Sequence, residues 1–95
     1  MAVFMERSNG EGWAHLVSDL HGEEGLLELV SFGRKIGLKR GIHRKGTYAE
    51  HYDIRDPEIQ LAKAAGARIV TRRELATILK DKKLSAFLSC QGNRR

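Results

Sequence analysis

The sequence predicts a single α/β (or α+β) domain, a small sandwich in which about three helices pack on a short mixed sheet. Short apolar runs of strand length alternate with segments of helical periodicity. Glycine, proline and helix-capping residues mark the ends of these segments. A chain of 95 residues that is 41% hydrophobic and 31% charged has the size and composition of one folded domain. We assign residues 1–90 to this domain and residues 91–95 to a flexible C-terminal tail.

Two strands are expected near the N-terminus. The apolar run 2–5 indicates a buried strand that ends in a polar turn over residues 6–10. A second strand should cover residues 13–17, with Trp13 in the core. Alternation divides its side chains between two faces, with Trp13, His15 and Val17 on one and Ala14 and Leu16 on the other.

The first helix is expected over residues 23–36. Glu23 and Glu24 suit its positively polarised start, and Gly37 suits the left-handed position after its end. Arg34 and Lys35 suit the last turn. The apolar stripe should contain Leu26, Leu29, Val30 and Gly33, widened by Leu27 and Ile36.

A β-hairpin is expected in the middle of the chain. A short strand over residues 42–44 and an extended run over 48–55 would join near residues 45–47. In strand geometry His51 and Asp53 share one face. Tyr52 and Ile54 share the other.

The last third should contain two helices and one strand. Asp56 is the expected N-cap, and Pro57 the first residue, of a helix that reaches residue 65. Residues 67–70 indicate a buried strand, after which Thr71 and Glu74 match a capping box. The last helix should turn Leu75, Ile78 and Leu79 inward, while residues 84–88 extend it or form a separate turn. The predicted order is β-β-α-β-β-α-β-α.

The chain resembles a small bacterial and phage family known as domain of unknown function 4031. The similarity covers roughly the first four-fifths of the chain. It rests on Val3-Phe4-Met5-Glu6, Trp13-Ala14-His15-Leu16 with Asp19, Ile36-Gly37-Leu38, His51-Tyr52-Asp53-Ile54, Ala65-Gly66-Ala67 and Thr71-Arg72-Arg73-Glu74-Leu75. The family has two acidic residues after the first strand, but here Arg7 follows Glu6. An aromatic residue and a glutamine near residues 42–44 are also missing. The resemblance implies no activity.

Charge distribution leaves two interpretations open. The net charge is +5, and no acidic residue lies between Glu28 and Glu50. Such a segment can be a solvated surface or can attract polyanions. Its cations are Arg34, Lys35, Lys39, Arg40, Arg44 and Lys45.

The segment 42–55 is the candidate functional site. Our first hypothesis is a binding domain for a phosphate-bearing ligand, either nucleic acid or a nucleotide. Its expected ligand-binding residues are His15, His43, Arg44, Lys45, His51, Tyr52, Asp53, Arg55 and Arg72. Tyr48 and Tyr52 could stack on a base if they are exposed. The structural alternative is that His51 and Asp53 form a hydrogen-bonded cross-strand pair.

Two other functions stay open. As a hydrolase or transferase of nucleotide-like substrates, the chain would use His43 or His51 as acid or base and Asp53 to orient it. As a phage accessory protein it would bind a host protein, marked by exposed Leu84, Phe87 and Leu88.

No cofactor and no metal are predicted. Enough donor side chains are present, but the local spacings typical of metal sites are missing. These donors are Glu6, His15, Asp19, His43, His51 and Asp53. The single Cys90 cannot form an internal disulfide, and no apolar run is long enough to span a bilayer. We therefore expect a cytoplasmic protein with no membrane partner.

Overall fold

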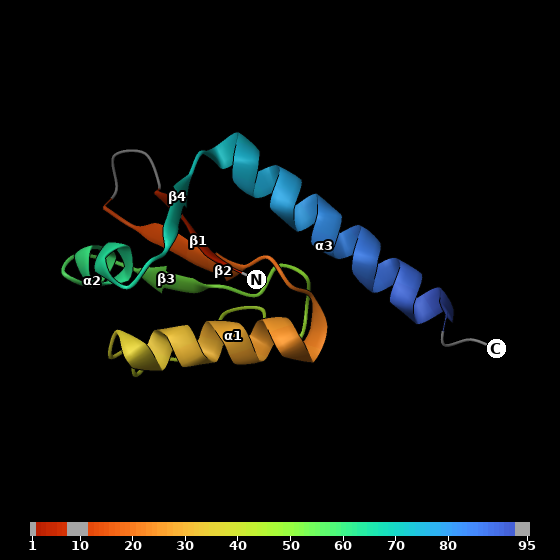
Figure 1. Ribbon diagram of the computed structural model, residues 1–95, viewed down its shortest axis with the longest axis horizontal. Coiled ribbons are helices and arrows are strands. Elements are labelled where there is room, and N and C mark those ends of the chain that lie inside the picture. The colour runs from red at the N-terminus through yellow and green to blue at the C-terminus, as the bar shows by residue number, and fades with distance from the viewer. Residues whose placement is uncertain (1, 8–11, 93–95) are drawn as a thin grey trace.

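A four-stranded mixed sheet with three helices forms the fold of the computed structural model, which describes residues 2–7 and 12–92 (Figure 1). The predicted fold class is confirmed. Within this described part, no helix has the length and apolar character needed to cross a membrane. The elements are β1 Val3–Arg7, β2 Ala14–Ser18, α1 Gly22–Lys35, β3 Tyr52–Ile54, α2 Glu58–Ala64, β4 Arg68–Val70 and α3 Arg72–Gly92.

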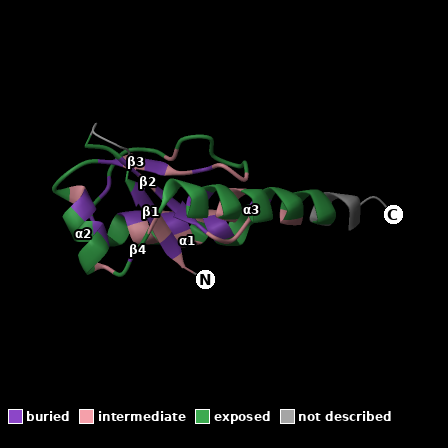
Figure 2. Cartoon of the chain, turned by 90° about the horizontal axis from the view of Figure 1, so that it is seen from above, coloured by how far each residue is buried: buried purple, intermediate pink, exposed green. Residues whose placement is uncertain are grey.

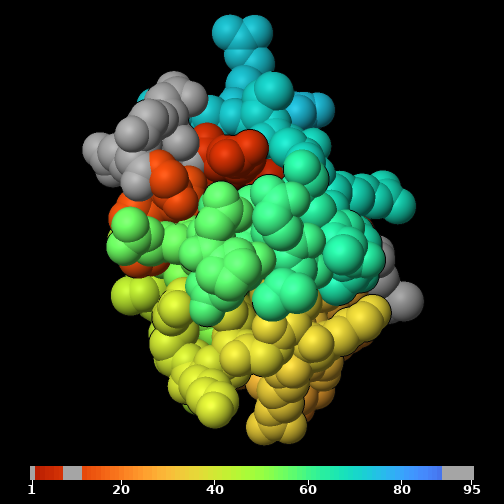
Figure 3. Space-filling model, turned by 90° about the vertical axis from the view of Figure 1, so that its left-hand side faces the viewer, coloured from red at the N-terminus to blue at the C-terminus, as the bar shows by residue number. Residues whose placement is uncertain are grey.

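The strands lie in the order β3-β2-β1-β4. Strand β2 is antiparallel to both β1 and β3, and β4 is parallel to β1. Three strands therefore share one direction. Helix α1 packs on one face of the sheet and α3 crosses the other, so the sheet lies between them (Figure 1). Figure 3 shows the end of the molecule where α2, in green, lies above the yellow surface of α1.

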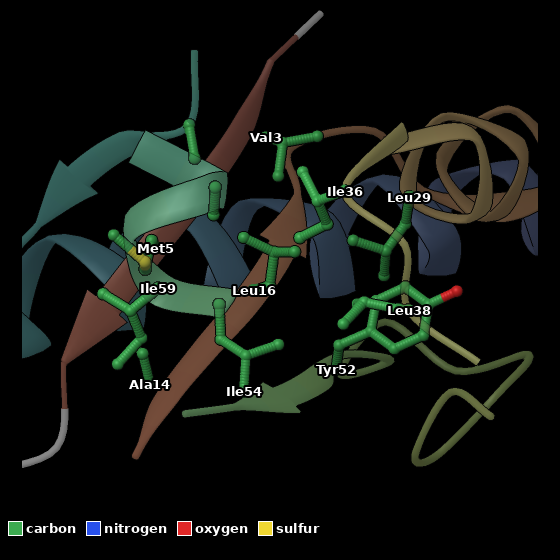
Figure 4. Close-up of a cluster of buried hydrophobic side chains, with 12 residues drawn as sticks. Val3, Met5, Ala14, Leu16, Leu29, Ile36, Leu38, Tyr52, Ile54 and Ile59 are labelled. Carbon is green, nitrogen blue, oxygen red and sulfur yellow. The ribbon is translucent and has the colours of Figure 1, made fainter. Parts of the chain in front are cut away.

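The core lies between the sheet and the helices α1 and α2 (Figure 4). Leu16 and Ile54 come from the sheet, Leu29 from α1 and Ile59 from α2, and all four are almost completely buried. Strand alternation is confirmed, because Ala14 and Leu16 face this core while His15 lies on the opposite face with Val17. The side chains of Glu6, His15 and Asp53 are thereby directed toward α3, whereas Ser18 donates to Glu28 of α1.

Helix α1 ends as the sequence predicts. Gly37 has a φ of 84°, and its N–H donates to the carbonyl of Arg34, while the N–H of Leu38 donates to that of Gly33. This pair of bonds is a Schellman motif, and it folds Leu38 back onto the core. Gly33 is also the point at which α1 touches the sheet, because a Cβ there would lie 2.8 Å from the Tyr52 ring.

The predicted hairpin is wrong in part, and the described residues form one strand fewer than expected. Only Tyr52–Ile54 forms a strand, and residues 42–44 contribute a single bridge in which His43 and His51 exchange backbone hydrogen bonds. Arg44 adopts a left-handed φ of 55°, and its carbonyl accepts bonds from the N–H and the hydroxyl of Thr47. The intervening residues therefore form a turn instead of continuing the strand pairing.

Three further expectations are corrected at element ends and edges. Strand β1 continues through Arg7, so Glu6 lies in the strand and not in a turn. Asp56 does not cap α2, because the N-cap position is Pro57. Strand β4 is not buried: it is an edge strand, and Ile69 is 54% exposed.

Trp13 is likewise not a core residue. Its side chain is 37% exposed, and the guanidinium carbon of Arg55 lies 4.8 Å from the ring centroid. Trp13 directly precedes β2 and therefore lies outside the strand.

Helix α3 begins with the predicted capping box. The Thr71 N–H donates to the Glu74 carboxylate at 2.8 Å, and the Glu74 N–H donates to the Thr71 hydroxyl at 3.1 Å. The helix continues without a break to Gly92, so residues 84–88 extend it and residues 91 and 92 belong to it. Residues 93–95 of the predicted tail lie outside the described residues. Most of the far half of α3 is exposed (Figure 2). Its exposed apolar residues include Leu84, Phe87 and Leu88.

One charged side chain of α3 is buried. Lys82 is only 2% exposed, and its Nζ has no hydrogen-bond partner among the described residues. Burial lowers the pKa of Lys82, and the carboxylates of Glu50, Asp19 and Glu28 partly oppose this effect. The buried charge of Lys82 therefore destabilises the packing of α3 on the rest of the fold.

The contribution of Lys82 to the free energy of unfolding is expected to increase as the pH approaches 10.5, the ordinary pKa of a lysine side chain, whereas the raised pKa of Tyr52 acts in the opposite direction. The folded state releases the Lys82 proton below that pH while the unfolded state still holds it, so alkaline conditions favour folding. Each unit by which the pKa is lowered adds about 1.4 kcal/mol. Urea denaturation of wild type and Lys82→Met at several alkaline pH values would measure the difference. The exposed neighbour Lys83 provides the control, since Lys83→Met should keep the wild-type pH dependence.

Candidate histidine and aspartate site

A row of polar side chains crosses the sheet on the face that α3 partly covers. Glu6 of β1 pairs with His15 of β2, and His15 pairs with Asp53 of β3. His15 and Asp53 each have a buried apolar neighbour on either side along the strand, and Glu6 follows the buried Met5. The alternation that buries those neighbours therefore places the three polar groups on one face.

Three imidazole rings surround the Asp53 carboxylate. The Nδ1 of His15 lies 2.8 Å from Oδ1 of Asp53, and the Nε2 of His51 lies 3.4 Å from the same oxygen. The Nε2 of His43 lies 3.5 Å from Oδ2. The backbone bridge between His43 and His51 explains this convergence, because it places both rings beside Asp53.

The rings also contact one another. His43 and His51 are stacked, with centroids 5.4 Å apart, and His15 meets His51 edge-on at 5.2 Å. Nδ1 of His51 lies 2.9 Å from the carbonyl oxygen of Ala49, and Nε2 of His15 lies 3.9 Å from the Glu6 carboxylate. Each of these two rings thus has a polar atom on the side away from Asp53, which fixes its orientation.

A cavity of about 320 Å³ opens beside these rings, between the sheet, the turn 44–49 and α3. Its polar walls carry two arginines, Arg44 from the turn and Arg72 from the first turn of α3. Its apolar walls come from the sheet, the turn and α3. The lining residues are Glu6, His15, Val17, Arg44, Ala49, His51, Arg72, Leu75 and Leu79.

The structure brings together some of the predicted ligand-binding residues. His15, Arg44, His51 and Arg72 line the cavity. His43 and Asp53 adjoin it through their contacts with the two lining histidines.

Other predicted residues lie elsewhere. Tyr52 points into the core and is 5% exposed, so it cannot stack on a base, and burial raises the pKa of its hydroxyl. Arg55 packs on Trp13 at a second hollow, and Arg40 is held there by a bidentate pair with Glu58 at 2.8 Å. Lys45 is exposed and is not among the cavity-lining residues. The predicted basic segment is therefore divided between two surfaces.

Sequence reasoning did not assign Leu75, Leu79, Val17 and Ala49 to the site. They appeared only as apolar positions, because no pattern in the sequence indicates that α3 crosses this face at a distance that leaves a cavity. Glu6 is a recognisable donor in the sequence. Because a turn is expected from residue 6 onward, the sequence does not indicate that Glu6 lies in a strand opposite His15.

Comparison with known proteins gives one result. A family model described as "Protein of unknown function (DUF4031)" matches residues 4–82. No curated protein and no solved structure matches the chain. The matched segment contains every residue of the histidine cluster and of the cavity wall, from Glu6 to Leu79.

Proposed function

The chain belongs to the DUF4031 family of proteins of unknown function, and from this premise we propose that its cavity binds a small phosphate-bearing ligand of nucleotide size. The observation that carries the proposal is the pairing of Arg44 and Arg72 with His15 and His51 around one cavity. Guanidinium groups bind phosphate through two parallel hydrogen bonds, and imidazoles add directional contacts.

The size and lining of the cavity favour a compact ligand. A volume of about 320 Å³ is at the lower end for small-molecule sites. Leu75, Leu79 and Val17 offer an apolar wall to a flat base, while the arginines face the phosphate. A long nucleic acid would need a continuous basic surface, whereas Arg40 of the predicted basic segment lies at the other hollow, together with Arg55. A nucleotide, or the terminal phosphate of a nucleic acid, fits better.

Substitution of Arg72 by Gln is expected to weaken binding of nucleoside monophosphates by about 10- to 100-fold, the usual effect of losing a charge-assisted hydrogen bond. Isothermal titration with a panel of these nucleotides at low salt, in the presence of a chelator, measures the affinity. The adjacent Arg73 does not line the cavity, so Arg73→Gln is a control with the same change of net charge. Equal losses in both variants would argue against the site.

Two further readouts sharpen this test. For a short single-stranded oligonucleotide, two phosphate contacts predict that log affinity falls with log salt with a slope of roughly −1.4. Arg44→Gly should lose affinity without losing stability, because glycine adopts the left-handed φ of 55° without strain. No binding of any nucleotide or oligonucleotide at low salt would refute the proposal.

A second function is favoured by the His15–Asp53 contact at 2.8 Å. A carboxylate that orients an imidazole in this way prepares it for proton transfer, and His15 faces the cavity. In such an enzyme His15, instead of His43 or His51, would act as the general acid or base. Release of inorganic phosphate or of a free base during the titrations would identify such a hydrolase.

A further inference from the structure

A neutral His51 ring would direct one hydrogen-bond acceptor, its Nε2, at another, the Asp53 carboxylate. A carbonyl oxygen only accepts, so the 2.9 Å contact between Nδ1 and the Ala49 carbonyl requires that Nδ1 carries the proton. In the neutral ring, Nε2 then presents a bare lone pair to Oδ1 of Asp53 at 3.4 Å. A positive charge between these two atoms, either a proton or a metal ion, removes the repulsion.

His15 has the matching arrangement. Its Nε2 is turned toward the Glu6 carboxylate, which attracts an N–H proton at 3.9 Å. With the proton there, Nδ1 is free to act as a ligand on the side of Asp53. Histidines that bind metals usually hold a carboxylate or a carbonyl with the other ring nitrogen. For His15 this group is the Glu6 carboxylate, and for His51 it is the Ala49 carbonyl.

Charge balance favours a metal ion over protonation of the rings. Three imidazolium groups around Asp53 would add three positive charges beside Arg44 and Arg72. Glu6 and Asp53 together supply two negative charges. With neutral imidazoles, one divalent ion balances the charge of the two carboxylates, and two imidazole nitrogens with one carboxylate oxygen form the protein donor set of known zinc sites.

The distances agree with this assignment. The ligand atoms of His15, His51 and Asp53 all lie within 4.8 Å of one another. Ligands at 2.0–2.1 Å from a tetrahedral zinc ion are separated by about 3.3 Å. The 3.4 Å between His51 and Asp53 matches this value, and 2.8 Å between His15 and Asp53 requires only a small opening when the ion replaces the His15 proton.

We propose that His15, His51 and Asp53, with His43 beside Asp53, bind one first-row divalent cation of the Zn²⁺ type. This proposal goes beyond the sequence-based expectation of no metal and does not depend on binding of a phosphate ligand. His15 and His51 line the cavity, so the ion is reached from there and has an open coordination position toward it. A His15 ring that binds the ion through Nδ1 is neutral and carries its proton on Nε2, toward Glu6.

The test uses the full chain, freed of metal with a chelator and then dialysed against Zn²⁺, with bound zinc measured by mass spectrometry. One zinc ion per chain is expected. Co²⁺ in place of Zn²⁺ should give the visible absorption of a four- or five-coordinate nitrogen and oxygen site. Asp53→Asn and His51→Gln should each lower the affinity by about 100-fold or more, since even outer partners of metal ligands contribute 10- to 100-fold.

The fourth histidine provides the matched control. His21 lies at the N-cap of α1, outside the cluster, so His21→Gln should bind zinc like the wild type. Equal loss in His21→Gln and His51→Gln, or no zinc bound by the wild-type chain, would overturn the proposal.

A measurement on the wild-type chain avoids any folding defect of the variants. Long-range ¹⁵N–¹H spectra of the imidazole rings during zinc titration should shift Nδ1 of His15 and Nε2 of His51. Unchanged ring nitrogens would refute the site. Because the nucleotide titrations contain a chelator, the proposed ligand binding and the proposed metal binding can fail independently of each other.

Discussion

Leu29→Ala is expected to lower the free energy of unfolding by about 2–5 kcal/mol, the usual cost of removing a large buried aliphatic side chain. Leu29 is completely buried where α1 packs on the sheet, and the core around it includes Leu16, Ile36 and Tyr52. Truncation removes its contacts and leaves a cavity that rigid neighbours from two elements cannot fill. Urea denaturation followed by circular dichroism measures the change as a shift of the transition midpoint.

Leu27 on the same helix is the matched control. It is 58% exposed, so Leu27→Ala should change stability by no more than about 0.5 kcal/mol. The two substitutions remove the same atoms from the same element, and only the packing differs. Equal costs for both would mean that α1 does not pack on the sheet as described.

Gly25→Ala is expected to destabilise the fold by about 1–3 kcal/mol, the typical cost of forcing additional atoms into a packed interior. Gly25 is buried in the first turns of α1, and a Cβ there would collide with the carbonyl oxygen of Leu20. The obstacle is backbone, so it cannot move aside as the end of a side chain would. The start of the helix must shift away from residues 18–20.

Helix propensity makes this prediction stringent. Alanine is favoured over glycine in helices by about 1 kcal/mol, so propensity alone predicts a gain in stability. Ser31→Ala, at an exposed position of the same helix, should be neutral or slightly stabilising. A gain in stability for Gly25→Ala, measured by urea denaturation, would show that the close approach does not exist in solution.

Local chemistry in the sequence was sufficient to predict much of the fold. The capping box of Thr71 and Glu74 and the left-handed Gly37 both depend on a few adjacent residues, and both are present. The extent of the middle strand was overestimated. The left-handed turn at Arg44 is uncommon for a residue that is not glycine, so the sequence does not indicate it.

The site was predicted only as a set of residue types. His51 and Asp53 lie close together in sequence, so strand alternation placed them on one face. The contact between His15 and Asp53 depends on the pairing of β2 with β3, and that of His15 with Glu6 on the pairing of β1 with β2. Sequence patterns do not specify strand order. Strand alternation alone places Tyr52 on the face opposite His51 and Asp53, and the structure buries it there, while Arg55 packs on Trp13.

The row formed by Glu6, His15 and Asp53 takes one residue from each of three strands, so it exists only when the sheet is assembled. Any molecule that binds these groups binds the native state and not the unfolded chain. Occupancy and folding are then linked equilibria, and a ligand at 100 times its dissociation constant adds about 2.7 kcal/mol to stability. The melting temperature of the unmodified chain can therefore serve as the readout for screening a library of compounds.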